Sequence, residues 1–166
     1  MPIIGKLIQK TTALSFKRNA KKGIDYRHQL EALRNTIERA KSTKFGFVYS
    51  FHAILTKTDV VSQYQKMVPI VDYDEFYEKW LKESIAGVKD HTWKGRIKYY
   101  ALSSGTTGSP SKRIPVTTEM IRSFQRVSLR QFSILHELNL PEEFYSASIL
   151  AVGGSTKLTK KSTHIE

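Results

Sequence analysis

The spacing of apolar residues along the first half of the chain predicts amphipathic helices. One helix is predicted over residues 26–41, because its apolar residues recur at intervals of three or four positions. These apolar positions are Leu30, Leu33, Ile37 and Ala40. Residues 1–25 precede this helix as a basic, modestly amphipathic lead-in that we expect to end near Gly23.

A cluster of aromatic residues follows the predicted helix. Gly46 interrupts the helical pattern there, and the aromatic positions are Phe45, Phe47, Tyr49 and Phe51. Aromatic side chains bury large apolar areas, so we expect this cluster to belong to the core rather than to a cofactor site.

A further helix is indicated by a capping pair. Asp72 is followed three positions later by Glu75, an arrangement that satisfies exposed N–H groups at a helix start. Gly87 is the expected terminator, since glycine readily adopts the left-handed conformation that ends many helices. The apolar face between them consists of Phe76, Trp80 and Leu81.

The second half of the chain alternates extended and helical patterns. Strands are predicted over residues 97–102, 113–116 and 145–152, and a helix is predicted over residues 119–138. The order is therefore strand, glycine-rich loop, strand, helix and strand. Together with the helices of the first half, this order predicts an α/β (α+β) fold class.

The helix predicted over residues 119–138 is strongly amphipathic, and Thr117 or Thr118 is suited to cap it. Its expected core face consists of Phe124, Ser128 and Leu135, flanked by Ile121, Val127 and Phe132. Its opposite face carries Arg122, Arg126 and Arg130.

The charge of the chain suits an anionic partner, because 27 basic and 15 acidic residues give a net charge of +12. The basic residues are spread along the chain, however, and no recognisable nucleic-acid-binding pattern accompanies them. No apolar run is long enough for a membrane span, so we expect neither a nucleic-acid nor a membrane partner. The chain has no cysteine, which excludes thiol chemistry and suits a cytoplasmic location. Its five histidines lack metal-ligand spacing, so we assign no metal site to them.

The stretch SSGTTGSPSKRIP, residues 103–115, has the composition of a phosphate-binding loop. Its glycines permit positive φ and a close approach of the backbone to a ligand, while its hydroxyls and its lysine would contact phosphate oxygens. The candidate residues are Ser104, Gly105, Thr106, Thr107, Gly108 and Lys112. The spacing excludes a nucleoside-triphosphatase P-loop, which needs four residues between its glycines and a Gly-Lys-Ser/Thr ending. An ordinary surface loop, with Lys112 solvated at its edge, is the alternative.

The same stretch resembles the phosphate-binding signature of adenylate-forming enzymes. The acyl-CoA synthetase branch usually has a short Pro-Lys-Gly after the second glycine, whereas residues 109–115 read SPSKRIP. A lysine followed shortly by proline is more similar to the Gretchen Hagen family, the auxin-responsive acyl acid–amido synthetases and their bacterial relatives. Three further stretches resemble that family in the same order: AKSTKFGFVYSFHAI, YQKMVPIVDYDEF and LAVGGSTKL.

The resemblance implies a reaction in which ATP and Mg²⁺ adenylate a small carboxylic acid, and an amino acid then displaces AMP to give an amide. It also implies that the six loop residues named above hold the ATP phosphates. Arg130 lies nearest the position of a family arginine that clamps the acyl carboxylate, although a solvated helix face is the simpler interpretation. Residues 153–156 border the acyl pocket by the same resemblance, or merely end a strand.

Family members are much longer than this chain. The resemblance therefore implies that residues 1–166 are the N-terminal portion of the acyl-activating domain, with the adenine loop, the metal ligands and the C-terminal domain beyond Glu166. We expect such a fragment to be inactive alone. Two alternatives stay open: a non-catalytic nucleotide- or anion-binding module, and a basic domain that binds nucleic acid or an acidic membrane surface. The sequence does not identify the acyl acid, the amino acid or the oligomeric state.

Overall fold

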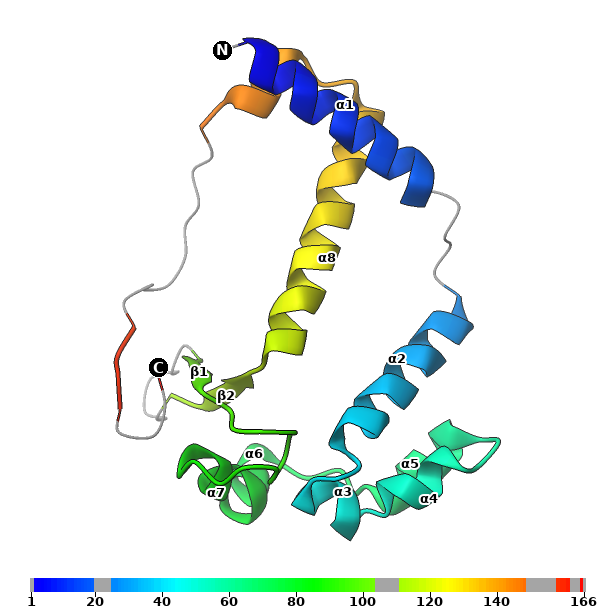
Figure 1. Cartoon of the computed structure of the whole chain (residues 1–166), viewed down its shortest axis with the longest axis vertical. Coiled ribbons are helices and arrows are strands. Elements are labelled where there is room, and N and C mark those ends of the chain that lie inside the picture. Colours follow the sequence, from blue (N-terminus) through cyan, green and yellow to red (C-terminus); the bar gives the residue numbers. More distant parts are fainter. Residues whose placement is uncertain (1, 20–24, 104–110, 149–157, 162–164, 166) are drawn as a thin grey trace. The chain divides into compact units, whose positions relative to one another are not determined.

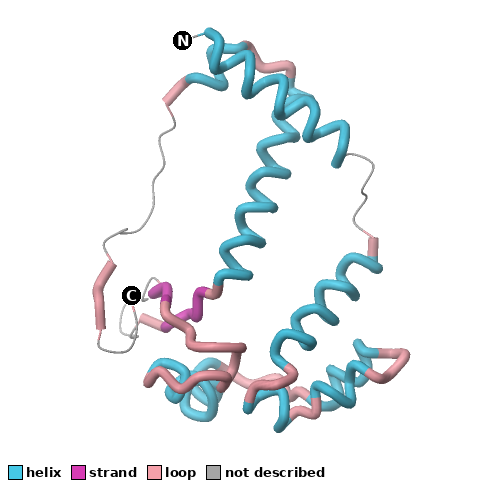
Figure 2. Tube along the Cα trace, in the orientation of Figure 1, coloured by secondary structure: helices cyan, strands magenta, loops and turns pink. Residues whose placement is uncertain are grey.

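The protein is described here by a computed structural model, which is mostly helical (Figures 1 and 2). The described residues are 2–19, 25–103, 111–148, 158–161 and 165. The chain divides into two compact units, which are treated separately below. The first consists of Met1–Ile24 and Thr118–Lys157, and the second of Asp25–Thr117 and Leu158–Glu166.

The first unit is helical throughout its described elements. They are helices α1 (Pro2–Asn19) and α8 (Thr118–Ile134) and the 3₁₀ segments η2 (Leu135–Leu138) and η3 (Glu142–Ser146). Helix α1 packs against the other three elements. The lead-in expected over residues 1–25 therefore contains a long helix. Gly5 permits its close approach to η3, because a Cβ at this position would collide with the carbonyl of Glu142.

The strand predicted over residues 145–152 is wrong where the structure describes it. Tyr145 and Ser146 end the 3₁₀ segment η3, and residues 149–152 lie outside the described part of the chain. Tyr145 is buried, with its hydroxyl donating to the carbonyl of Leu135 at 3.4 Å. The Ser146 hydroxyl donates back to the carbonyl of Glu143 at 3.2 Å, a local bond that competes with extended pairing.

The apolar face of α8 also differs from the prediction. From 121 to 132 every residue of the helix is exposed, and Phe124 is 61% exposed. The buried residue of α8 is Ser133, whose hydroxyl donates to the carbonyl of Arg130 at 2.7 Å. The periodicity thus predicted the helix correctly, but in the described structure the apolar face is not part of a core.

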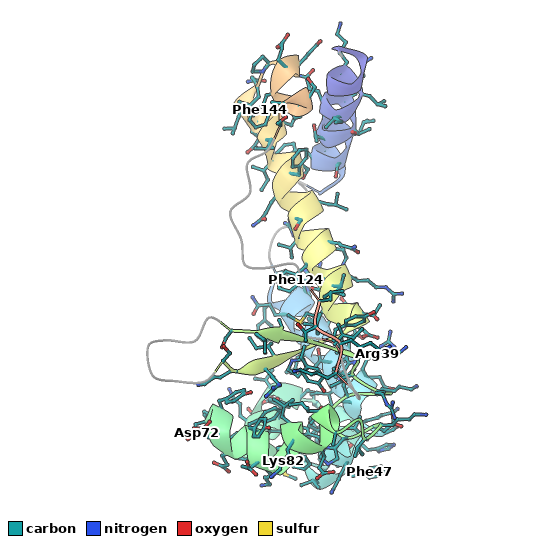
Figure 3. All side chains as sticks on the ribbon, turned by 90° about the vertical axis from the view of Figure 1, so that its left-hand side faces the viewer. Arg39, Phe47, Asp72, Lys82, Phe124 and Phe144 are labelled. Carbon is teal, nitrogen blue, oxygen red and sulfur yellow. The ribbon has the colours of Figure 1, made fainter. Side chains whose placement is uncertain are left out.

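The second unit begins with four helices that enclose the larger hydrophobic cluster. They are α2 (Tyr26–Ala40), α3 (Lys44–Val48), α4 (Phe51–Leu55) and α5 (Val60–Met67). The buried members of the cluster are Ile37, Ala40, Tyr49, Phe51, Ile54, Val60 and Trp80. Of the four aromatic residues expected in the core, Tyr49 and Phe51 are buried and Phe45 packs against them, whereas Phe47 is 74% exposed (Figure 3).

A tight junction joins α2 to α3. Thr43 is fully buried, and its hydroxyl donates to the carbonyl of Ala40 at 2.7 Å while accepting from the N–H of Gly46 at 3.0 Å. A Cβ on Gly46 would collide with the Ala40 carbonyl, so only glycine fits against the end of α2. The next two N–H groups, those of Lys44 and Phe45, donate to carbonyls of residues 90 and 91 at 2.8 and 2.9 Å.

The rest of the second unit continues the helix predicted after Asp72. It comprises α6 (Tyr73–Phe76), the π-helical segment η1 (Tyr77–Leu81), α7 (Lys82–Ile85) and the antiparallel strands β1 (Tyr99–Leu102) and β2 (Arg113–Val116). Gly87 has a φ of 93°, as expected of a glycine that ends a helix. A smaller cluster of Leu81, Ile97 and Tyr100 underlies the hairpin. Within the described part of the chain, no helix has the length and apolar content needed to cross a bilayer.

Candidate functional site

The candidate site lies where the two strands of the hairpin meet the glycine-rich loop. Leu102 pairs with Arg113 at the loop end of the sheet, and Tyr99 pairs with Val116 at the other end. Pro115 lies opposite Tyr100, and such a proline is compatible with an edge strand because it has no N–H to donate. The hairpin thus places residues 103 and 112 at the two ends of the loop.

Ser103 and Lys112 close the base of this loop. The N–H of Ser103 donates to the carbonyl of Lys112 at 2.9 Å, and the N–H of Lys112 donates to the hydroxyl oxygen of Ser103 at 2.9 Å. These bonds extend the hairpin by one residue pair beyond β1 and β2. They fix the backbone of Lys112, while its side chain is exposed.

Tyr73, from the first turn of α6, contacts the second strand next to the loop. Its hydroxyl accepts a hydrogen bond from the N–H of Arg113 at 2.8 Å and donates to the carbonyl of the same residue at 3.3 Å. The ammonium nitrogen of Lys112 lies 4.9 Å from the centroid of the Tyr73 ring, within the range of a cation–π interaction. One half-buried tyrosine therefore contacts both residues that follow the loop.

The position of Tyr73 depends on the cap of its helix. The Asp72 side chain, at the start of α6 in Figure 3, accepts a hydrogen bond from the N–H of Glu75 at 2.8 Å. This bond satisfies one of the N–H groups that the first helical turn leaves without a backbone partner. The cap predicted at Asp72 is confirmed, and it places Tyr73 at the first helical position.

The other strand of the hairpin is anchored by Tyr100. This residue is 3% exposed and packs with Leu81 and Ile97, and its N–H donates to the carbonyl of Ile165 at 2.8 Å. Burial disfavours the charged phenolate and raises the pKa of Tyr100 to about 12. Strand β1 is therefore anchored in the smaller hydrophobic cluster, and strand β2 is hydrogen-bonded to Tyr73 of α6.

The structure places only two of the predicted site residues. Lys112 lies in the second unit at the loop base, whereas Arg130 lies on the exposed part of α8 in the first unit. The remaining predictions fall on residues outside the described part of the chain: Ser104, Gly105, Thr106, Thr107 and Gly108, and also residues 153–156. Their assignment stays a prediction.

Sequence reasoning missed the contribution of Tyr73 and assigned no role to Ser103. The capping pair marks the helix start next to Tyr73, but it does not show what the tyrosine contacts. Arg113 is separated from Tyr73 by 40 positions, so no local pattern connects them. Ser103 borders the loop directly, and its bonding became visible only from the register of the hairpin.

The residues at the base of the loop are basic. Among the residues that the structure describes, no group of three or more His, Asp or Glu side chains is arranged to hold a metal ion. Lys112 and Arg113 are adjacent basic residues at the end of the loop, and the backbone N–H of Lys112 donates to the hydroxyl oxygen of Ser103 at 2.9 Å. An exposed ammonium group at the end of a loop suits the binding of an anion with several oxygens.

Comparison with known proteins assigns the chain to a family. Residues 16–163 match the GH3 family N-terminal domain, a range that includes the whole hairpin and both placed site residues. No curated protein matches the chain, and no solved structure matches it. The GH3 (Gretchen Hagen 3) family comprises acyl acid–amido synthetases, which are adenylate-forming ligases that use ATP. This chain belongs to the GH3 family and carries its N-terminal domain over residues 16–163.

Proposed function

We propose that the chain forms the N-terminal part of an enzyme that adenylates a small carboxylic acid with ATP and transfers the acyl group to an amino acid. The observation that carries this proposal is the family match over residues 16–163, which includes the loop and its hairpin. In the proposed enzyme, residues 1–166 belong to the large acyl-activating domain, and the remaining parts of the active site lie beyond this chain.

The proposed role of the glycine-rich loop is to hold the phosphates of ATP. Gly105 and Gly108 would permit close approach of the backbone, and the hydroxyls of the loop would donate to phosphate oxygens. Lys112 would offset the negative charge that shifts onto pyrophosphate as the acid attacks the α-phosphate. The support from the described residues is the hairpin itself, which ends in a backbone-bonded Lys112.

Mg²⁺ would accompany ATP and neutralise part of its charge. The proposal places its ligands outside this chain and assigns direct contact with the phosphates to the loop residues and Lys112. The order of events is then ATP binding, attack by the carboxylate, release of pyrophosphate and aminolysis of the acyl-adenylate. The loop contributes to the first three of these events.

Arg130 is proposed as a ligand for the acyl carboxylate. Its support is that Arg130 lies, on the helix after the loop, nearest the position of the family arginine that clamps the acyl carboxylate. The alternative is that Arg130 belongs to a solvated helix face together with Arg122 and Arg126. Comparison of Arg130→Ala with the matched control Arg126→Ala decides between them. A rise in the KM for the acid with the first variant alone supports the proposal, while equal behaviour of the two variants contradicts it.

The test of the function is exchange of labelled pyrophosphate into ATP by the full-length enzyme, with a panel of carboxylic acids. We expect exchange that requires both Mg²⁺ and one class of acid, followed by amide formation when amino acids are added. ATP binding without exchange for any acid would favour the non-catalytic nucleotide-binding module. Retention on nucleic acid or anionic vesicles that falls steeply with salt, again without exchange, would favour the basic interaction domain.

A further inference from the structure

Three contacts at the loop base converge on one side chain. Tyr73 binds both backbone polar groups of Arg113 through its hydroxyl, at 2.8 and 3.3 Å. Its ring also lies 4.9 Å from the ammonium nitrogen of Lys112. Tyr73 comes from a different element than the hairpin and is separated from it by 40 positions, so these contacts are tertiary rather than local.

The hydroxyl contact restricts the strand that carries Lys112. A hydroxyl that accepts from an N–H and donates to a carbonyl of one residue opposes both sliding and rotation of that residue. Arg113 also pairs with Leu102 across the sheet. The backbone immediately after Lys112 is therefore held from the sheet and from α6.

The ring contact restricts the side chain of Lys112. A lysine has a long, flexible stem, so an exposed ammonium group samples many positions unless something holds it. The face of an aromatic ring attracts a cation and still leaves its N–H groups free to bond elsewhere. The ring can therefore orient Lys112 without taking the place of an anionic ligand.

We propose that Tyr73 is a positioning residue of the adenylation site, which holds the backbone of Arg113 with its hydroxyl and orients the ammonium group of Lys112 with its ring. This inference rests on the proposed function, in which Lys112 faces the ATP phosphates. It assigns a function to a residue of α6, outside the glycine-rich loop. Tyr73 acts through Lys112 and Arg113 rather than by contact with ATP.

Two substitutions separate the contributions of the hydroxyl and the ring. Tyr73→Phe removes the hydroxyl and keeps the ring, and we expect it to lower kcat for pyrophosphate exchange roughly two- to tenfold. Tyr73→Leu removes both, and we expect a further loss of roughly two- to fivefold, the scale of one exposed cation–π contact. The KM for ATP should change less than kcat, because the charge that Lys112 offsets grows in the transition state.

The same two substitutions made together with Lys112→Ala give the decisive comparison in the full-length enzyme. If the ring acts through Lys112, then Tyr73→Phe and Tyr73→Leu should have equal activity when Lys112 is replaced. If Tyr73 has only a structural role, the difference in activity between Tyr73→Phe and Tyr73→Leu should be equally large with and without Lys112. This result would overturn the proposal. Tyr64→Leu, at a half-buried tyrosine of α5 that packs on Phe51, controls for loss of core packing.

A spectroscopic readout on the 166-residue chain does not depend on catalysis. Protons held over the face of an aromatic ring resonate upfield, so the ε-methylene protons of Lys112 should lie upfield of those of lysines that contact no aromatic ring. Lys79 is left out of this comparison, because its ammonium nitrogen lies 6.0 Å from the centroid of the Tyr49 ring and 5.8 Å from that of Trp80. Tyr73→Phe should keep this shift and Tyr73→Leu should abolish it. If Tyr73→Leu does not fold, Tyr73→Met replaces it, because methionine keeps more side-chain volume but has no ring.

The outcomes distinguish this inference from the proposed function. If Lys112→Ala leaves exchange unchanged, the phosphate-binding role of Lys112 fails, and the inference fails with it. Two other outcomes would contradict only the positioning role of Tyr73, provided that Lys112→Ala impairs exchange. The first is that Tyr73→Phe and Tyr73→Leu still differ in activity when Lys112 is replaced. The second is that the upfield shift is missing from the unsubstituted chain.

Discussion

Ser103 and Lys112 face each other across the base of the glycine-rich loop and exchange two hydrogen bonds of 2.9 Å each. One bond is a regular backbone bond, and in the other the Ser103 hydroxyl takes the place of a backbone carbonyl. The pair continues the antiparallel ladder of β1 and β2. The backbone is therefore held by hydrogen bonds at both ends of the loop, at Ser103 and at Lys112.

Lys112→Ala should slow adenylation in the full-length enzyme about ten- to a thousandfold, the scale of losing one or two transition-state interactions. Lys112→Arg should recover only part of this activity, because a planar guanidinium does not replace a compact ammonium. Pyrophosphate exchange measures the effect. Amide formation from a synthetic acyl-adenylate serves as the control, and an equal loss in both assays would contradict the assignment.

Gly108→Val should nearly abolish adenylation without unfolding the protein. The substitution adds a β-branched side chain where we propose that the backbone approaches phosphate closely or adopts positive φ. The measurement is pyrophosphate exchange, with circular dichroism to verify folding. Near-normal exchange by this variant would show that the loop does not cradle the phosphates.

Gly46→Ala should destabilise the protein by about 3 kcal/mol, at the upper end of the range for overpacking. Its Cβ would meet the carbonyl of Ala40, which cannot move without shifting the end of α2. Gly95→Ala is the matched control: its Cβ has no neighbour within 4 Å, but its φ of 81° makes alanine cost about 1 kcal/mol. Urea unfolding measures both, and equal costs would contradict the packing argument.

Asp72→Ala should cost about 1 kcal/mol, because it removes the side-chain acceptor that the Glu75 N–H uses at 2.8 Å. Asp72→Asn should stay close to the unsubstituted protein, since asparagine caps helices about as well as aspartate. Thermal or urea unfolding measures the stability of both variants, and Asp72→Ala should be the less stable. If both variants were equally destabilised, the charge of Asp72 rather than its capping bond would be responsible.

Tyr100 should make the protein less stable in strong alkali. Burial raises its pKa in the folded state from 10.0 to about 12, so the folded protein keeps this proton where the unfolded chain loses it. The associated stability is fully present below about pH 10 and is lost as the pH rises to about 12. Urea unfolding between pH 9 and about pH 12 should show a smaller decline for Tyr100→Phe than for the unsubstituted chain. Identical declines would contradict this cause.

Local patterns predicted much of the secondary structure. The spacing of Leu30, Leu33 and Ile37 predicted a helix over residues 26–41, and α2 is Tyr26–Ala40. The strands around the loop were also predicted in the correct order, as was the helix stop at Gly87. These features depend on interactions between residues that are close in the chain, so the sequence alone contains the information for them.

Predictions of which side chains are buried were less reliable, because burial depends on the other elements that pack against a segment. Phe47 has the same aromatic character as Phe45 and Phe51, but it lies on the outer side of the short helix α3 and is exposed. Tyr145 begins an apolar run that suits a strand, but its burial in η3 and its bond to Leu135 favour a 3₁₀ turn. In both cases the packing of other elements decides which side of a segment is covered.

The sequence by itself determined the phosphate-loop composition, the capped helix after Asp72 and the resemblance to a family, because each is contained in a short stretch of residues. Only the tertiary structure brought Tyr73 to Arg113 and Lys112, since that contact joins α6 to a strand 40 positions away. Hydrogen bonds and cation–π contacts form wherever packing places suitable groups within reach. A local pattern carries no record of that distance, and for this reason the two strands beside the loop could be predicted while the tyrosine that contacts the second strand could not.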